Sequence, residues 1–106
     1  MSDSRTVREL LSDPNRWTKH VVARDPKGEP VNPFHPTACQ FCMAGACQRL
    51  SGGDIDKYRA LLDRICFAAR EFFPYRVIDS DIITELNDDP TVSHADILNI
   101  IRYACV

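Results

Sequence analysis

The segment HPTACQFCMAGACQRL, residues 35–50, contains the side chains of this sequence that are best suited to chemistry. Three cysteines, Cys39, Cys42 and Cys47, follow His35 at short intervals. Their spacing resembles the start of a zinc knuckle, C-x2-C-x4-H-x4-C. A structural zinc ion needs four converging ligands. Here cysteine replaces the knuckle histidine and a glycine stands where the fourth ligand belongs, so we expect no metal site.

Two other kinds of thiol chemistry fit parts of the segment. Cys39 and Cys42 have the C-x-x-C spacing of redox pairs, and a helix beginning just before Cys39 would favour its thiolate through the helix dipole. Cys42 could instead be a nucleophile of the cysteine-hydrolase type, with His94 and Asp88, or with His20, as its activating groups. No strand-helix-strand pattern surrounds the pair, and Cys42 is expected inside the core, so neither chemistry is favoured.

Packing explains the same segment more simply. Thr37 and Gln40 fit a capping box that predicts a helix from there to about Leu50. Apolar or small residues cover two sides of this helix, which is typical of a central helix with neighbours on both sides. Gly45 predicts a close crossing by another element. Only the arc with Gln40 and Cys47 is expected to face water, so Cys47 should be the most accessible of the three thiols.

Capping and breaking signals predict the elements around this helix. A Thr6–Glu9 capping box opens a short first helix, Asp54 caps a long helix that ends near Phe73, and Ser93 with Asp96 opens a last helix. A turn at residues 25–28 predicts a β-hairpin, and a helical turn is expected at residues 80–86. The fold class is therefore mainly α: a single small domain, residues 1–106, of four to five helices with an appended β-hairpin at about residues 17–31.

Charge and hydropathy exclude several classes of partner. The net charge is −2 and the isoelectric point about 5.8, so no strong positive field exists to gather nucleic acid or an anionic membrane. The N-terminus lacks a signal-peptide pattern, and no apolar run approaches the roughly 20 residues that span a bilayer. We therefore expect a cytoplasmic protein with free thiols, because the cysteine count of five is odd.

Five residues join Cys42 as candidate contacts for a partner or ligand: Trp17, Arg24, Phe67, Asp88 and His94. Each also has a structural interpretation. A lone tryptophan is more often a core anchor, Arg24 can hold the adjacent turn, Asp88 can form a turn, and His94 fits a hydrogen-bonded core position. Phe67 projects onto the polar side of the long helix, so it needs a cover from the first helix or from another subunit.

Three motifs together resemble a known family. They are WTKHVVARDPKG from Trp17 to Gly28, A-x-x-F-C-M-x-G-A from Ala38 to Ala46, and N-D-x-P-x-x-x-x-x-D-I-L from Asn87. The sequence resembles, over about residues 7–105, a family of small bacterial and phage-associated proteins described only as a domain of unknown function. The resemblance implies no activity and no catalytic residue.

The sequence thus favours a non-enzymatic cytoplasmic helical module that acts through a protein partner or through self-association. No catalytic residue, cofactor or metal ligand is predicted, and no nucleic acid or membrane partner. The alternative is a small thiol-dependent or zinc-binding protein that uses Cys39 and Cys42.

Overall fold

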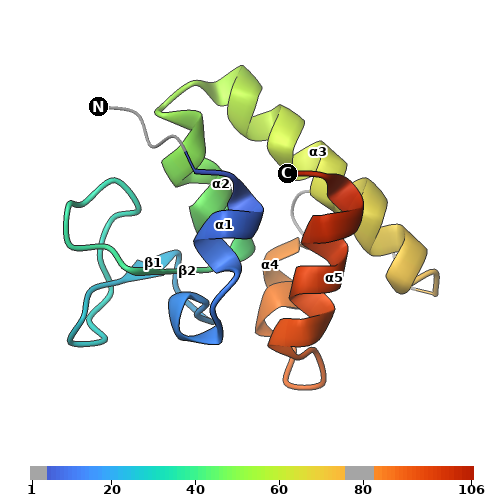
Figure 1. Cartoon of the computed structure of the whole chain (residues 1–106), viewed down its shortest axis with the longest axis horizontal. Helices are drawn as coiled ribbons and strands as arrows, with labels where there is room; N and C mark the ends of the chain where they lie inside the picture. The colour runs from blue at the N-terminus through green and yellow to red at the C-terminus, as the bar shows by residue number, and fades with distance from the viewer. Residues whose placement is uncertain (1–4, 76–82) are drawn as a thin grey trace.

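The computed structural model describes residues 5–75 and 83–106. These residues form five α-helices, one 3-10 turn and a two-stranded antiparallel sheet (Figure 1). In chain order the elements are α1 (Val7–Leu11), η1 (Pro14–Arg16), β1 (Ala23–Arg24), β2 (Gln40–Phe41), α2 (Met43–Ser51), α3 (Ile55–Phe72), α4 (Ile83–Asp88) and α5 (His94–Ala104). The predicted fold class, a small mainly α domain, is confirmed.

Local capping chemistry sets most helix starts where the sequence predicts them. Thr6 and Ser93 each form a complete capping box, with Glu9 and Asp96 respectively. The Asp54 side chain accepts hydrogen bonds from two backbone N–H groups in the first turn of α3. These interactions satisfy amide groups that have no partner within the helix. Of the predicted turn at residues 80–86, the part before Ile83 lies outside the described residues.

The predicted start of α2 is wrong. The helix begins at Met43, and Cys42 is its N-cap residue, with Sγ accepting from Gly45 N at 3.2 Å. Gln40 and Phe41, expected inside the helix, pair instead with β1 in register Ala23↔Phe41. Pairing with β1 therefore outweighs the capping signal of Thr37 and Gln40. The local sequence cannot reveal this pairing, because β1 lies far away along the chain.

The predicted hairpin is present only as its turn. Gly28 N donates to Asp25 O at 2.9 Å and Val31 N donates to Ala23 O at 3.0 Å, which closes the chain over residues 25–28. Beyond that, Arg24 and Pro30 form a single isolated bridge. Proline has no N–H to extend a ladder. The extended partner of β1 is therefore β2, which comes later in the chain.

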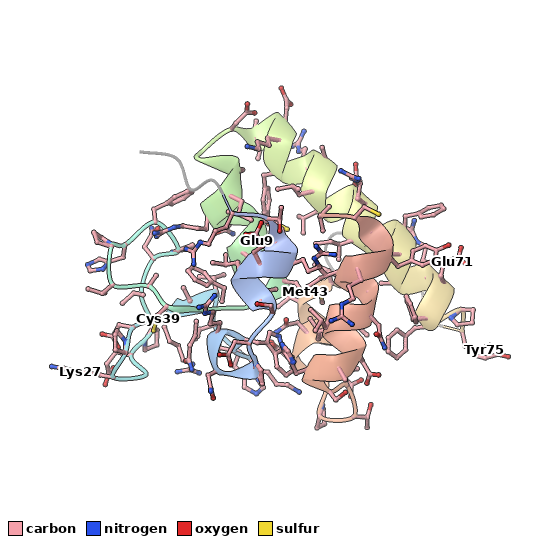
Figure 2. The ribbon with its side chains drawn as sticks, in the orientation of Figure 1. Glu9, Lys27, Cys39, Met43, Glu71 and Tyr75 are labelled. Carbon is pink, nitrogen blue, oxygen red and sulfur yellow. The ribbon has the colours of Figure 1, made fainter. Side chains whose placement is uncertain are left out.

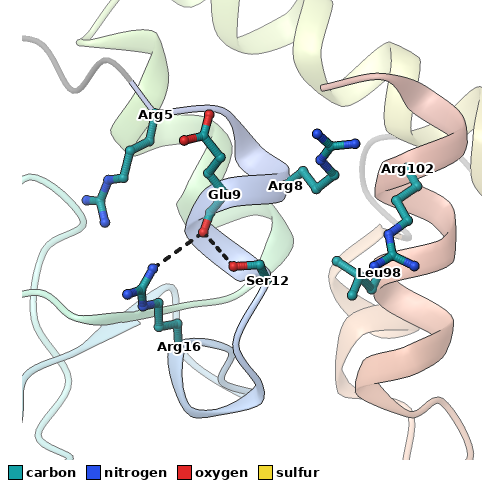
Figure 3. A pocket seen from close by; sticks show the side chains of 7 residues that line it. All are labelled: Arg5, Arg8, Glu9, Ser12, Arg16, Leu98 and Arg102. Carbon is teal, nitrogen blue, oxygen red and sulfur yellow. Dashed lines mark hydrogen bonds between the residues drawn. The ribbon is translucent and has the colours of Figure 1, made fainter.

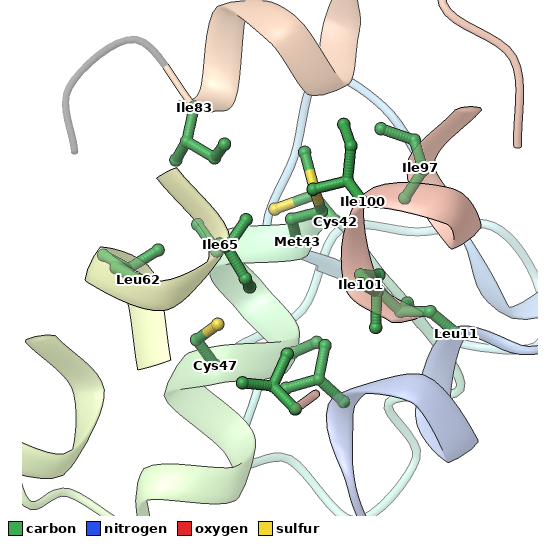
Figure 4. Packing of buried hydrophobic residues seen from close by; sticks show 14 of the residues in the cluster. Leu11, Cys42, Met43, Cys47, Leu62, Ile65, Ile83, Ile97, Ile100 and Ile101 are labelled. Atoms are coloured by element: carbon green, nitrogen blue, oxygen red, sulfur yellow. The ribbon is translucent and has the colours of Figure 1, made fainter. Parts of the chain in front are cut away.

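Helix α2 lies at the centre of the domain, in contact with α1, α3 and α4, while α5 packs on α3 and α1 (Figure 1). The core gathers buried aliphatic side chains from every helix around α2 (Figure 4). The largest fully buried side chains include Leu10, Leu11, Phe41, Met43, Ile65, Ile83, Leu86, Ile97, Ile100 and Ile101. The described residues contain no helix of the length and apolar character that a membrane crossing requires.

The close crossing predicted at Gly45 is confirmed, and the backbone of Val22 makes it. A methyl group added at Gly45 would lie 1.9 Å from Val22 O and 2.8 Å from Val22 C. The same carbonyl oxygen accepts from Cys42 N at 3.3 Å. The Val22 backbone, which leads into β1, thus packs directly against the first turn of α2. Only glycine at position 45 leaves room for this contact.

Candidate functional site

The side chain of Asn87 joins segments from all three motifs. Its Oδ1 accepts from Trp17 Nε1 at 2.8 Å and from Met43 N at 3.1 Å, and its Nδ2 donates to Thr18 O at 3.0 Å. Asn87 is buried. We call Asn87, Trp17, Thr18 and Met43 the Asn87 cluster. An amide has two donors and two acceptor sites, so it can bind the indole N–H and two backbone groups at once.

Two further contacts join residues 19 and 20 to the last residue of α4 and to the loop after it. Asp88 Oδ1 accepts from His20 N at 2.8 Å, and His20 has a left-handed φ of 72°. A non-glycine residue seldom adopts that conformation without such support. Lys19 Nζ donates to Asp89 O at 2.8 Å and lies 5.0 Å from the centroid of the Trp17 ring. The Lys19 ammonium group therefore links the segment that contains Trp17 to the loop after α4.

The Asn87 cluster gives the motifs a structural role. Every buried side-chain nitrogen and oxygen in residues 5–75 and 83–106 has a hydrogen-bond partner. The Asn87 amide is thus engaged with other parts of the chain. Asn87 is not among the candidate residues that the sequence indicates, although it begins the third motif. The need of a buried indole N–H for an acceptor was the signal that could have found it.

Arg24 and His94 are likewise engaged with the backbone. Arg24 Nε donates to Thr18 Oγ1 at 2.8 Å and its Nη1 donates to Gly28 O at 2.9 Å, so this side chain holds the turn at residues 25–28. His94 Nε2 lies 2.7 Å from Leu11 O, and its ring centroid is 5.7 Å from that of Trp17. His94 thereby ties the start of α5 to the end of α1.

The Cys42 thiol is buried in the core among aliphatic side chains (Figure 4), and Cys42 precedes Met43 of the Asn87 cluster. Burial raises the pKa of Cys42, and the negative charge of Asp88 adds to this increase, while N–H groups of Gly45 and Ala44 oppose it. The structure thus brings Asp88 near Cys42. His94 bonds to a backbone carbonyl and His20 faces Asp88, and no hydrogen bond joins either ring to the Cys42 thiol in the part of the chain that the structure describes.

The other two clustered thiols lie in opposite environments from those expected. Cys39 is exposed in the loop before β2, at the edge of the molecule, whereas Met43 lies at its centre (Figure 2). Cys47 is fully buried. The predicted exposure of Cys47 is wrong because α2 starts at Met43 and is covered on that side by α3. No group of three or more His, Cys, Asp or Glu side chains in the described residues could hold a metal ion.

We expect Cys39 and Cys105 to react with a thiol reagent much faster than Cys42, Cys47 and Cys66 under native conditions. The first two are exposed and the other three are buried, and buried thiols react only through opening of the structure. Brief alkylation followed by mass spectrometry of peptides checks this order. Because Cys39 lies outside any helix, its fast reaction would not indicate a dipole-activated thiolate. Labelling of Cys42 or Cys47 at the rate of Cys39 would contradict this description.

The free energy of unfolding should fall as the pH rises above about 9. Burial raises the pKa of Cys47 far above its ordinary value of 9.0, and that of Cys42 is raised as well. Above pH 9 the unfolded chain loses these protons while the native state keeps them, so each thiol lowers stability by up to about 1.4 kcal/mol per pH unit. Denaturant unfolding of the wild type and Cys47→Ala at several pH values checks this. An equal slope in both proteins would show that Cys47 ionises in the native state.

Three aromatic side chains lie exposed across α3 and α5. Phe67 is 61% exposed, Tyr103 53% and Phe72 44%. The rings of Phe72 and Tyr103 meet edge to face, with centroids 5.7 Å apart. Phe67 and Tyr103 line one depression, together with Asp63, Arg64 and Ala104. We call Phe67, Phe72 and Tyr103 the aromatic face. The predicted cover of Phe67 by the first helix is wrong, because the first helix packs on α2 and α5 instead.

Comparison with known proteins gives one match. Neither the curated proteins nor the solved structures that were compared with the chain gave a match. One family model, described as a family of unknown function (DUF6197), matches residues 4–105. This match covers all three motifs that meet at the Asn87 cluster. The chain therefore belongs to this family of unknown function.

Proposed function

We propose that the protein is a non-enzymatic helical module that binds another protein through its aromatic face. The observation that carries this proposal is the exposure of Phe67, which is the largest for any aromatic side chain within the described helices. Phe67 and Tyr103 stand on two helices that are fixed in the core by Ile65 and Ile101. Rigid, adjacent aromatic side chains are the usual anchors of protein interfaces.

The charges around the aromatic face favour a partner other than a second copy. On α3 the charged side chains one turn to either side of Phe67 are Asp63 and Arg64, then Arg70 and Glu71. Two copies packed antiparallel across Phe67 would place Asp63 against Glu71 and Arg64 against Arg70. Like charges in contact oppose association. We therefore infer a partner segment with an apolar side chain for the depression, acidic side chains toward Arg64 and Arg70, and basic side chains toward Asp63 and Glu71.

A photo-crosslinking amino acid in place of Phe67 tests this proposal. We expect p-benzoyl-L-phenylalanine at position 67, in the cells that make the protein, to give one discrete adduct with a different protein. The same residue in place of Phe34, another exposed aromatic outside the aromatic face, is the matched control and should give none. The identified partner should then bind the purified wild type and lose affinity for Phe67→Ser by at least about tenfold, as expected for a central aromatic anchor.

Two results would overturn the proposal. An adduct at position 34 but not at position 67 would place the binding surface elsewhere. Sedimentation of the purified protein as a dimer that Phe67→Asp dissociates would show that the aromatic face binds a second copy, and the inferred partner chemistry would be wrong.

A further inference from the structure

A small, mostly apolar depression lies where the turn between α2 and α3 meets the loop at residues 32–37. Its volume is about 250 Å³, below the range of sites for drug-sized ligands, so it suits a ligand of few atoms. We call it the Phe34 pocket. It is separate from the aromatic face, because the two lie at opposite ends of α3. Its walls include Phe34, Gln48, Ser51, Asp54, Ile55 and Tyr58.

A larger depression between α1 and α5 is less suited to hold one ligand. Its volume is about 430 Å³, and four arginines are among its lining residues. Their side chains do not converge, since Arg5 and Arg8 point away from each other (Figure 3). Positive groups that diverge in this way do not share a ligand, so this depression carries no proposal.

The two aromatic rings of the Phe34 pocket have faces that no other ring uses. Phe34 is 48% exposed, and neither Phe34 nor Tyr58 pairs with another aromatic ring in the part of the chain that the structure describes. The loop that carries Phe34 is held in place, because Arg49 Nη1 donates to Pro33 O at 2.9 Å and to His35 O at 3.0 Å. Tyr58 stands on α3. The two rings are therefore carried by separate elements, each of them fixed to the domain.

Asp54 gives the Phe34 pocket its charge, since it is the only charged residue among those that line it. Its Oδ1 caps α3 by accepting from Asp56 N at 3.0 Å and Lys57 N at 3.2 Å. Its Oδ2 accepts no hydrogen bond from residues 5–75 and 83–106. The end of α2 and the start of α3 both lie at the pocket, so their helix dipoles oppose each other there. The pocket thus combines one negative charge with two aromatic rings.

We propose that the Phe34 pocket binds the trimethylammonium group of a small free ligand. The faces of aromatic rings attract such cations, and the Asp54 carboxylate adds to the attraction. A trimethylammonium group has no N–H donor, so it needs no hydrogen-bond acceptors in a mostly apolar wall. A primary ammonium or a metal ion would need several. A neutral apolar ligand would cover the carboxylate without compensating its charge. This proposal does not depend on the function proposed for the aromatic face.

Titration of the whole chain with choline, followed by its backbone amide resonances, tests the proposal. We expect saturable shifts at Ser51, Gly53 and Ile55, which line the pocket, at millimolar choline. The neutral carbon analogue of choline, in which a tert-butyl group replaces the trimethylammonium group, is the matched control ligand. It has the same shape without the charge, so it should bind at least about tenfold more weakly.

Two pairs of variants separate the carboxylate from the ring. Asp54→Asn removes the charge but keeps a good N-cap residue, and should weaken choline binding about three- to tenfold. Asp56→Asn makes the same change outside the pocket, in the first turn of α3, and should stay within about twofold of the wild type.

Phe34→Leu keeps an apolar side chain but removes one aromatic face, so it should also weaken choline binding about three- to tenfold. Tyr75→Leu removes a fully exposed ring outside the pocket and should leave the affinity unchanged. Circular dichroism of each variant confirms that the fold is retained, since all four residues are exposed.

Four results would overturn the proposal. The first is the absence of saturable shifts with choline. The second is equal affinity for the neutral analogue, which would show that the pocket takes any apolar group of this shape. The third is an equal loss in Asp54→Asn and Asp56→Asn, which would show only a response to net charge. The fourth is sedimentation of the protein with phosphatidylcholine vesicles without binding of free choline, which would assign the pocket to a lipid headgroup.

Discussion

Asn87→Leu is expected to lower the free energy of unfolding by about 3–5 kcal/mol, which is a large fraction of the stability of a domain of this size. Leucine matches asparagine in size but offers no hydrogen bonds. Three groups would lose their partner together: Trp17 Nε1–H, Met43 N–H and Thr18 C=O. Each buried polar group left unpaired costs about 1–3 kcal/mol. Chemical unfolding followed by the fluorescence of Trp17 measures the change.

Asn99→Leu is the matched control for this substitution. Asn99 is exposed on α5, so the same chemical change there should alter stability by no more than about 0.5 kcal/mol. If Asn87→Leu does not fold, Trp17→Phe provides a milder test, because it removes the indole N–H and part of the ring but keeps the Asn87 amide, and it should cost about 1–3 kcal/mol. Circular dichroism follows the unfolding of this variant, since it lacks the single tryptophan of the chain. A loss below about 0.5 kcal/mol in both cluster variants would mean that the cluster does not support the fold.

Gly45→Ala is expected to destabilise the protein by a net of about 1–3.5 kcal/mol, although alanine normally stabilises a helix interior by about 0.5–1 kcal/mol relative to glycine. The added methyl would meet the Val22 carbonyl at 1.9 Å, so backbone must move. That movement also weakens the bond from Cys42 N to the same oxygen. Overpacking costs about 1–3 kcal/mol, and the loss of a hydrogen bond adds about 1 kcal/mol.

Ala60→Gly measures the opposing helix-propensity effect by itself. Ala60 is exposed in the middle of α3, so this control should cost only about 0.5–1 kcal/mol. Comparison of the changes in unfolding free energy of the two variants then gives the cost of the close crossing at Gly45. Denaturant unfolding of both proteins decides the question. A Gly45→Ala protein more stable than the wild type would contradict the close packing of the Val22 backbone against α2.

The predictions from sequence that held rest on chemistry within a few residues. The capping boxes of Thr6 and Ser93 and the side-chain cap of Asp54 act on amide groups two or three positions away. Their interactions do not depend on the rest of the fold. Gly52 ends α2 with a φ of 61°, a conformation that its missing Cβ allows. Signals of this kind are fully contained in the local sequence.

The predictions that failed depend on partners distant in the chain. Thr37 and Gln40 have the spacing of a capping box, but the Thr37 hydroxyl lies 2.7 Å from His35 Nδ1 and Gln40 is in β2. Asn87 pairs with residues 44 and 70 positions away, and no local pattern distinguishes it from a turn former. Gly45 was an intermediate case. Its small size in a helix indicated a crossing, although the sequence could not identify Val22 as the crossing residue.

Hydrogen exchange of the Trp17 indole N–H tests most directly whether the three motifs form one buried structural cluster. The chain has a single tryptophan, so its indole proton gives one resonance. That N–H and the Met43 amide share the acceptor Asn87 Oδ1. We expect both protons to exchange through the same opening, with protection factors that agree within about tenfold. Exchange of the indole proton at the rate of free indole, while the Met43 amide stays protected, would show that Trp17 is not held by Asn87.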